Sequence, residues 1–330
     1  MPVDAAAAAA VDPTGQRAEV VGLPEHLRDA LWRVDSADGP RTRSAGLVVA
    51  AMGGSAIGGR LAKAVLGPRE QRPIVVVSGY DLPAWVDEEW TVLLSSYSGS
   101  TEETLACWDA AGAAGARRVV ATTGGPLAER AREAGVPVIP MPAGFQPRAA
   151  VGYSTVIALE VAAACGVAPS VREEIEAAAA AVEDVPDPER LVEAIGDGVP
   201  LIVGAELTAP LAYRWKCQVN ENANRPAFWN ELPEHDHNEI EGWADPIVPV
   251  FLVDPESHPR NLRRFEVTAE IARDAGLAPL VVRQGGETRA ERVFRLVLLG
   301  DLLTIDMAIR AGTDPAAIPA LDRVKAALKQ

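Results

Sequence analysis

Hydroxyl side chains are concentrated at residues 95–104, where the sequence reads Ser-Ser-Tyr-Ser-Gly-Ser-Thr-Glu-Glu-Thr. The segment follows an apolar run and precedes residues with helical periodicity, which predicts a strand, a turn and a helix N-terminus. Hydroxyl groups, a glycine and the free N–H groups of a new helix suit the oxygens of a phosphate monoester. Serine and threonine also cap helices, but capping does not require so many hydroxyl groups ahead of the helix. We therefore interpret the segment as a phosphate-binding loop.

A second candidate anion site is the glycine-rich segment at 52–59, Met-Gly-Gly-Ser-Ala-Ile-Gly-Gly, which follows one predicted strand and opens a helix. Glycines at such a turn let backbone N–H groups approach an anion at the helix N-terminus. The segment is not a dinucleotide-binding fingerprint, because Ser55 stands where that motif has its second glycine. It also lacks the Gly-Lys-Ser/Thr ending of a Walker loop. Taken alone, it is explained equally well as a glycine-eased turn.

Residues 220–239 are the third segment, which we expect to end a helix and continue as a long loop without a strand pattern. The segment is rich in carboxylates and amides and contains His235 and His237. Long polar loops in compact domains are usually functional. Zinc or manganese is one alternative, but a spacing of two places both imidazoles on one face only in a strand, so we favour a site without metal. His26 and His258 stand alone and are expected at the surface or as helix caps.

The elements that position these segments alternate between short apolar runs and longer helical stretches, which is typical of an α/β fold with parallel sheets. Strands are predicted at 46–52, 73–78, 91–95, 118–122, 136–140, 200–204, 249–253 and 279–283. Helices are predicted at 57–66, 101–114, 127–134, 208–222, 260–275 and 287–311, with a helical region at 150–197. Ligands bind beyond the carboxyl ends of the strands in such sheets, so the first two segments should lie on one side.

A weak internal similarity indicates that the two halves are copies. Residues 48–56 align with 201–209, but the glycines of the first copy are missing from the second. Only the first half would then keep an anion site lined by backbone. The segment Asp-Val-Pro-Asp-Pro at 184–188 is the predicted hinge.

The composition narrows the function classes. The chain of 330 residues has 31 basic and 46 acidic residues and a net charge of −15, which disfavours nucleic acid and anionic membranes as partners. Cys107, Cys165 and Cys217 are scattered in apolar stretches, so we expect buried free thiols and a cytoplasmic location. The alanine run at 5–10 is too short to span a bilayer and has no basic flank, so no signal peptide or membrane segment is expected.

Several motifs occur in a fixed order along the chain. They are Met-Gly-Gly-Ser at 52–55, Ser-Tyr-Ser-Gly-Ser-Thr-Glu-Glu-Thr at 96–104, Gln-Pro-Arg at 146–148, Asn-Glu-Asn at 220–222, Pro-Ala-Phe-Trp-Asn-Glu at 226–231 and His-Asn-Glu at 237–239. In this order they resemble the bifunctional phosphoglucose/phosphomannose isomerases, a branch of the sugar isomerase (SIS) domain proteins. The resemblance extends from residue 46 to the C-terminus.

The resemblance implies two SIS domains, each a flavodoxin-like parallel sheet flanked by helices. Residues 46–185 would be the phosphate-binding domain and 186–330 the domain with the catalytic glutamate and histidine loop, after an N-terminal tail and helix at 1–45. It implies a homodimer that isomerises glucose 6-phosphate, with mannose 6-phosphate as a further candidate, to fructose 6-phosphate. No metal and no organic cofactor are implied.

The resemblance also assigns residues. Six of them would contact the substrate: Gly53, Gly54 and Ser55 at the sugar, and Ser96, Ser98 and Thr101 at the phosphate. Arg148 corresponds to the arginine that stabilises the enediolate, and Glu221 to the catalytic base. His237 corresponds to the ring-opening histidine, which reaches the site of the neighbouring subunit, and Lys325 to the lysine that assists ring opening.

These residue types fit the reaction. An aldose–ketose shift moves one proton between C1 and C2, so a single carboxylate of suitable pKa can remove and return it. A closed sugar ring needs an acid and a base to open, and the negative enediolate needs a fixed cation nearby. The reaction has no net redox change and no group transfer, which agrees with the lack of a recognisable cofactor motif.

Several alternatives stay open. Taken alone, Glu221, Arg148 and Lys325 would be ordinary surface residues. Acceptance of mannose 6-phosphate is associated with a threonine shortly before the terminal lysine, and the segment 314–319 contains none, Thr313 being the nearest. A non-catalytic sugar-phosphate-binding SIS regulator would lack the base or carry a DNA-binding module. A synthase would need a glutaminase domain, and a metal-dependent isomerase would lose activity on chelation.

Overall fold

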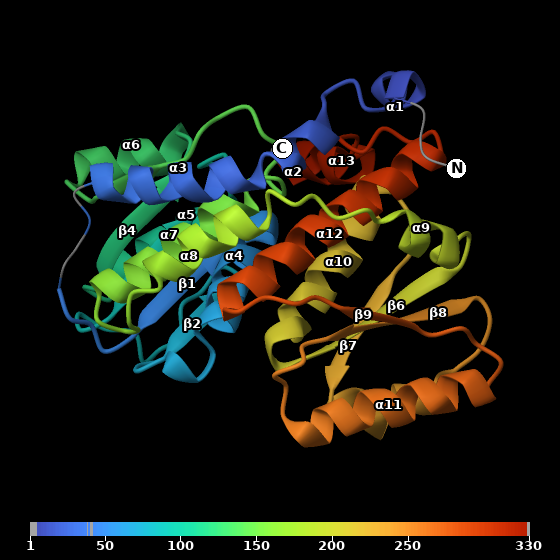
Figure 1. The fold of residues 1–330 in the computed structure, drawn as a ribbon. Helices are drawn as coiled ribbons and strands as arrows, with labels where there is room; N and C mark the ends of the chain where they lie inside the picture. The colour runs from blue at the N-terminus through green and yellow to red at the C-terminus, as the bar shows by residue number, and fades with distance from the viewer. Residues whose placement is uncertain (1–4, 38, 40–41, 329–330) are drawn as a thin grey trace. The chain divides into compact units, whose positions relative to one another are not determined.

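The computed structural model describes residues 5–37, 39 and 42–328. The chain divides into two compact units (Figure 1). The N-terminal unit consists of residues 22–183 and 288–291, and the C-terminal unit of residues up to 21, 184–287 and 292 onwards. The division between 183 and 184 falls at the predicted hinge.

The N-terminal unit is built on a five-stranded parallel sheet with the strand order β2-β1-β3-β4-β5. The strands are β1 Leu47–Ala51, β2 Ile74–Val77, β3 Thr91–Ser95, β4 Arg117–Thr122 and β5 Val138–Pro140. Every residue of β1 and β3 is buried, as is typical of strands in a parallel sheet whose two faces are covered by helices. The order corresponds to the flavodoxin-like arrangement of doubly wound folds.

Helices surround this sheet. They are α3 Leu23–Ser36, α4 Gly53–Leu66, α5 Glu102–Ala113, α6 Gly125–Glu133, α7 Val151–Ala164 and α8 Arg172–Ala181, with a short 3₁₀ helix η1 at Gly67–Arg69. Helix α7 is buried along most of its length and packs against α3 and α4 (Figure 1). Small residues bring α4 and α7 together, because a Cβ at Gly58 would lie 2.3 Å from the Ser154 hydroxyl.

The C-terminal unit contains a four-stranded parallel sheet with the order β7-β6-β8-β9. The strands are β6 Val199–Ala205, β7 Phe228–Leu232, β8 Ile247–Val253 and β9 Leu280–Arg283. The helices are α1 Ala5–Val11, α2 Gln16–Val21, α9 Glu189–Ile195, α10 Ala209–Asn222, α11 Pro259–Asp274, α12 Arg289–Arg310 and α13 Pro319–Leu328. The first three residues of α12 belong to the N-terminal unit, and the rest of this helix belongs to the C-terminal unit. Three 3₁₀ helices complete the unit: η2 Glu206–Thr208, η3 Glu234–His237 and η4 Glu239–Gly242.

The predicted parallel α/β architecture is confirmed, and each predicted strand has its counterpart within one or two residues. One predicted helix begins earlier than expected, because α4 includes the glycine segment from Gly53 onwards. Glycines carry no apolar periodicity, so the helical pattern became visible only at residue 57.

The prediction that residues 220–239 contain no strand is wrong. Strand β7 pairs with β6 in parallel, with Leu201 opposite Phe228 and Ala205 opposite Leu232. The strand has five residues at the sheet edge, and Phe228 is 54% exposed, so its burial pattern is weak. The two histidines of the segment, His235 and His237, lie after this strand, in the 3₁₀ helix η3.

Candidate active site

The glycine segment and the hydroxyl segment lie side by side at one edge of the N-terminal sheet. Ala51 pairs with Ser95 at the carboxyl ends of β1 and β3, so the residues that follow emerge at the same edge. Gly53 begins α4 with a φ of +49°, a conformation that favours glycine. The predicted common location of these two segments is confirmed.

Hydrogen bonds within the hydroxyl segment fold it into a compact turn. The hydroxyls of Ser96 and Thr101 lie 2.8 Å apart, and the Gly99 N–H donates to Ser96 Oγ at 3.1 Å. Thr101 is the residue before α5, but its side chain makes no capping hydrogen bond among the contacts of that helix. The threonine hydroxyl is therefore directed to Ser96, while Ser98 is exposed. Hydroxyls at a helix N-terminus in this arrangement can receive a phosphate.

Glycine is required inside this turn. Gly99 has a φ of +66°, and a Cβ there would lie 1.8 Å from the Gly124 carbonyl oxygen. The turn is thus held directly against the loop between β4 and α6, and the Leu127 N–H in the first turn of α6 donates to the Gly99 carbonyl at 3.0 Å. Sequence reasoning did not single out this supporting loop, although its Thr-Thr-Gly-Gly-Pro composition directly after a strand is a loop signal.

Arg148 is brought to the glycine segment by a close backbone approach. A Cβ at Gly54 would lie 2.8 Å from the Pro147 carbonyl oxygen and 3.1 Å from Arg148 Cα. Arg148 is only 3% exposed, although it stands in the loop between β5 and α7. Arginines on loops are normally exposed to solvent. The burial of Arg148 therefore fits a fixed positive charge next to a binding site. The N-terminal unit therefore gathers the two motifs and Arg148 together.

Glu221 lies in the last turn of α10, on a half-buried face that also carries Tyr213, Lys216 and Asn220. The opposite face of α10 is anchored by a buried polar network to α12. Arg214 Nη2 donates to both carboxylate oxygens of Asp301 at 2.8 and 2.7 Å, and Gln218 Nε2 donates to the same carboxylate at 2.9 Å.

The network continues next to Glu221, because Asn222 Nδ2 donates to the Thr304 hydroxyl at 2.9 Å. Asn222 is fully buried, and Thr304 in turn donates to the Gly300 carbonyl at 3.0 Å. Side chains four residues apart lie on one face of a helix, so these contacts fix the rotation of α10 about its axis. Glu221 is thereby directed to the other, half-buried face.

His235 and His237 differ sharply within η3. His235 is fully buried, with its Nδ1 at 3.2 Å from Glu239 Oε2 and its ring 5.3 Å from that of Trp243. His237 is exposed. Across the part of the chain that the structure describes, no group of three or more histidine, cysteine or carboxylate side chains is placed to hold a metal ion.

Lys325 lies on the terminal helix α13, which has no buried residues. The same helix exposes Leu321, Val324 and Leu328, at 45, 56 and 62% of their surface. Among the ten predicted site residues, seven thus belong to the N-terminal unit. The other three, Glu221, His237 and Lys325, lie on three separate elements of the C-terminal unit.

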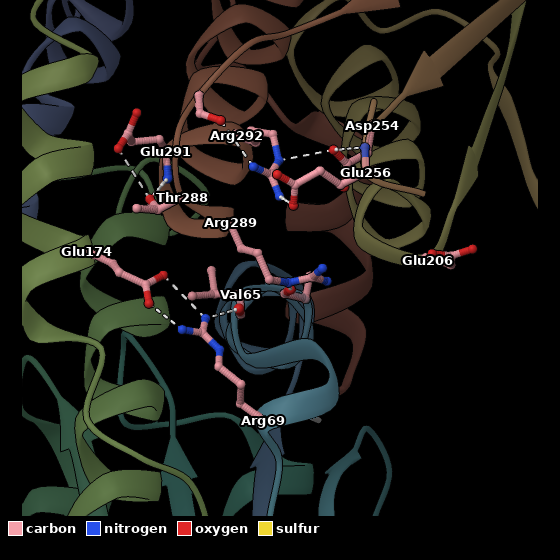
Figure 2. Close-up of polar contacts among 12 residues, drawn as sticks. Val65, Arg69, Glu174, Glu206, Asp254, Glu256, Thr288, Arg289, Glu291 and Arg292 are labelled. Atoms are coloured by element: carbon pink, nitrogen blue, oxygen red, sulfur yellow. Dashed lines mark hydrogen bonds and ion pairs between the residues drawn. The ribbon is translucent and has the colours of Figure 1, made fainter. Parts of the chain in front are cut away.

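The turns of the C-terminal unit that correspond to the two loops differ in chemistry. Glu206 follows β6 with a φ of +51°, close to that of Gly53 at the aligned position. After β8, Asp254 and Glu256 bind the buried Arg292, whose Nε lies 3.0 Å from Asp254 Oδ1 and whose Nη2 donates to Glu256 Oε2 at 2.5 Å (Figure 2). Carboxylates therefore line the turn after β8, where the N-terminal unit has hydroxyl groups.

Comparisons with known proteins show the family of the chain. Residues 185–328 match the family model described as the bacterial phospho-glucose isomerase C-terminal SIS domain. A bifunctional phosphoglucose/phosphomannose isomerase of Caldicellulosiruptor bescii is 36% identical, over 84% of this chain and 88% of that protein. The chain belongs to the bifunctional phosphoglucose/phosphomannose isomerase family. Another protein of that name, from Aquifex aeolicus, is 34% identical over 86% of this chain and 91% of its own.

Solved structures agree at the level of the fold. A hypothetical protein of Thermus thermophilus superposes with a TM-score of 0.75 and 17% identity, covering 96% of this chain and 90% of that one. Among the described residues of this phosphoglucose/phosphomannose isomerase family member, every helix is too short or too polar to cross a membrane.

The thiols of this isomerase family member are free. Cys107 and Cys165 are buried as predicted, whereas Cys217 is only half-buried. Burial, with smaller contributions from the carboxylates of Asp81 and Glu103, raises the pKa of the Cys107 thiol to about 11. Burial also raises the pKa of Cys217. Both thiols are therefore protonated at neutral pH and are poor nucleophiles.

Proposed function

We propose that this protein interconverts glucose 6-phosphate and fructose 6-phosphate, with mannose 6-phosphate as a further candidate substrate, through an enediol and without metal. The observation that carries the proposal is the hydroxyl turn with its paired Ser96 and Thr101, located at the same sheet edge as the glycine segment and the buried Arg148. Relatives that match most of the chain are named as isomerases of these substrates.

Phosphate and sugar recognition belong to the N-terminal unit in this proposal. The phosphate would accept hydrogen bonds from Ser96, Ser98 and Thr101 and from the N–H groups that begin α5. Gly53 and its neighbours, Gly54 and Ser55, would line the sugar. Hydroxyl and backbone donors can hold a dianion through hydrogen bonds, which suits a substrate that must enter and leave.

Proton transfer and ring opening would use charged side chains. Glu221 would remove the proton at C2 or C1 and return it to the neighbouring carbon, and the fixed guanidinium of Arg148 would stabilise the enediolate between these steps. His237 and Lys325 would act as acid and base at the ring oxygen and O1. The anchored face of α10 supports the role of Glu221, because a base must keep a constant distance from the carbon that it deprotonates.

A homodimer would complete the site, with His237 reaching the site of the neighbouring subunit. The exposure of His237 leaves its ring available to a partner. The apolar face of α13, formed by Leu321, Val324 and Leu328, supports association of the chain, because exposed apolar patches commonly mark interfaces. Free cysteines fit a reducing compartment, so we assign the protein to the cytoplasm.

We also propose that residues 46–185 and 186–330 are two SIS domains that follow an N-terminal tail and helix at 1–45. The strand order of the C-terminal sheet repeats the first four positions of the N-terminal sheet. Gly53 and Glu206 share an unusual positive φ at aligned positions after the first strand of each sheet. A shared backbone conformation at aligned positions with different residues supports this proposal.

The test is an NMR assay in D₂O with EDTA, in which the purified protein is offered fructose 6-phosphate. Deuterium at C2 of glucose 6-phosphate is expected, and its appearance in mannose 6-phosphate would extend the substrate range. Activity that EDTA abolishes would contradict the metal-free mechanism. Binding of fructose 6-phosphate without product or exchange would support a non-catalytic sugar-phosphate sensor instead.

A further inference from the structure

Tyr97 stands inside the phosphate turn, but its side chain serves another segment. Its hydroxyl accepts a hydrogen bond from the Phe145 N–H at 2.8 Å and donates to the Pro142 carbonyl oxygen at 3.0 Å. Both partners are backbone groups of the loop at residues 141–150, which connects β5 to α7 and carries Arg148. One tyrosine hydroxyl thus connects two segments that are about 45 residues apart in sequence.

The backbone of Tyr97 is held from the other direction. Its carbonyl oxygen accepts hydrogen bonds from the Thr123 N–H at 3.1 Å and from the Thr123 hydroxyl at 2.8 Å. These bonds fix the main chain between Ser96 and Ser98, the two serines proposed to bind phosphate. Because the main chain of Tyr97 is fixed, its hydroxyl is a stationary anchor for the loop that it contacts.

The loop at 141–150 is also held at its start, where the Met141 N–H donates to the Thr122 carbonyl at 2.9 Å. It contains no regular helix or strand, and its backbone includes a turn in which the Ala149 N–H donates to the Gln146 carbonyl at 2.8 Å. The Phe145 ring packs against His26 with the ring centroids 4.8 Å apart. Arg148 follows Phe145 by three residues, so the Tyr97 hydroxyl holds the main chain close to the arginine.

We propose that Tyr97 is a positioning residue that couples the phosphate turn to the Arg148 loop, so that bound phosphate and the arginine keep a constant distance. This inference rests on the proposed function, in which the phosphate lies on Ser96 and Ser98 and Arg148 stabilises the enediolate. The phosphate and the reacting C1–C2 bond are at opposite ends of a hexose 6-phosphate. A small change in the spacing of the two loops therefore moves the cation away from the charge that develops, at little cost to phosphate binding.

The first test is the pair of variants Tyr97→Phe and Tyr153→Phe. The control is matched, because the partly buried Tyr153 hydroxyl also makes a hydrogen bond, 2.9 Å to Asp29, and its ring also packs on Phe145. Tyr97→Phe should lower kcat about tenfold, as expected when two ordinary hydrogen bonds that hold a charged group are lost, and leave KM within about twofold. Tyr153→Phe should leave both constants unchanged. Equal kcat values for Tyr97→Phe and the wild type would overturn the proposal.

The second test separates positioning from general destabilisation. In an Arg148→Ala background, Tyr97→Phe should cause no further loss of kcat, because the tyrosine acts through the arginine. A tenfold loss in both backgrounds would mean that Tyr97 acts independently of Arg148, which contradicts the proposal.

A third measurement does not depend on turnover. Hydrogen exchange is followed with a hexitol 6-phosphate, which has the phosphate but no carbonyl to isomerise. Binding should slow exchange at residues 96–101 and at 142–148 in the wild type, but only at 96–101 in Tyr97→Phe. Protection of both segments in the variant would overturn the coupling while leaving the phosphate site in place. No protection at 96–101 in the wild type would instead contradict the proposed phosphate site, and the coupling with it.

Discussion

The turns after β3 and after β8 occupy the same place in two sheets of the same strand order, yet their side chains are opposite in chemistry. The two turns can be aligned on the residue before the helix that follows, which is Thr101 in one unit and His258 in the other. In this alignment Ser96 corresponds to Val253 and Ser98 to Pro255. Three hydroxyl residues in the first turn are replaced by an apolar residue, a proline and a histidine. The fold supplies a helix N-terminus in both places, and the side chains decide whether an anion can use it.

In the turn after β8, an arginine of the same unit, Arg292, binds the carboxylates of the turn. Arg292 is buried and lies between Asp254, which is also buried, and Glu256, which is 61% exposed (Figure 2). An incoming phosphate would meet these carboxylates, and the arginine that could attract it is already paired. Glu206 adds a further carboxylate, which accepts hydrogen bonds from the His258 N–H and from Asn261 Nδ2. One copy of the turn therefore presents hydroxyl groups, whereas in the other an arginine and two carboxylates are paired with one another.

The largest effect on turnover is expected from replacing Glu221, the proposed catalytic base in the C-terminal unit. If the N-terminal turn binds the phosphate and Glu221 transfers the proton, Glu221→Gln should lower kcat roughly a thousandfold with KM little changed, since the amide cannot act as a base. Steady-state kinetics measures both constants. Glu270→Gln, at an exposed position of α11, is the control and should behave as the wild type. Turnover at the wild-type level in Glu221→Gln would remove this residue as the base.

The ion pairs of the turn after β8 can be removed by replacing Arg292. Arg292→Met should destabilise the protein by about 3 kcal/mol, because it leaves the buried Asp254 carboxylate without its counter-charge. Urea unfolding followed by circular dichroism measures the loss. The double variant Asp254→Asn/Arg292→Met should recover part of it, because no buried charge remains. A double variant less stable than Arg292→Met would show that the pair does not act as a unit.

Phosphate binding by the turn after β3 can be tested by removing one of its hydroxyl groups. Thr101→Val is nearly isosteric and removes the partner of Ser96, so KM should rise by about tenfold or more while kcat changes less, as for loss of a hydrogen bond to a charged phosphate. The matched variant in the other unit is His258→Asn, which can still accept the capping bond from the Arg260 N–H. His258→Asn should leave KM unchanged. Equal increases in the two variants would abolish the distinction between the turns.

The smallest effect concerns two histidines near the N-termini of helices, His26 in the first turn of α3 and His258 directly before α11. His258 caps α11 as expected, but the expectation of a surface or capping role for His26 is wrong, because His26 is 7% exposed. Burial lowers the pKa of His26, against the opposing influence of Asp29 and Glu25. Below the ordinary value of 6.5, the unfolded chain therefore binds a proton that the folded chain does not, and stability falls as the pH falls.

His26→Gln should remove this pH dependence. Between pH 7 and pH 5, the free energy of unfolding should decrease less in the variant than in the wild type, as measured by urea unfolding at several pH values. Parallel curves for the two proteins would mean that another group titrates in this range.

The local patterns in the sequence were sufficient for most of the architecture. Strands such as β1 and β3 are continuous apolar runs between turn residues, and this signal depends only on neighbours in the chain. Strand β7 was missed because its pairing with β6, not its own composition, makes it a strand. The positions of the glycine and hydroxyl loops followed from the strands that precede them.

The sequence by itself determined the order of the strands and helices other than β7, the two candidate loops and the residue types that suit a sugar phosphate, because these follow from short-range spacing. Only the tertiary structure decided which groups meet. The approach of Arg148 to Gly54, the Tyr97 hydroxyl bridge to Phe145 and the ion pair of Asp254 with Arg292 all join residues that are far apart in the sequence. Contacts of that kind depend on how helices and loops pack on the sheet, and no local pattern of residues encodes the partner.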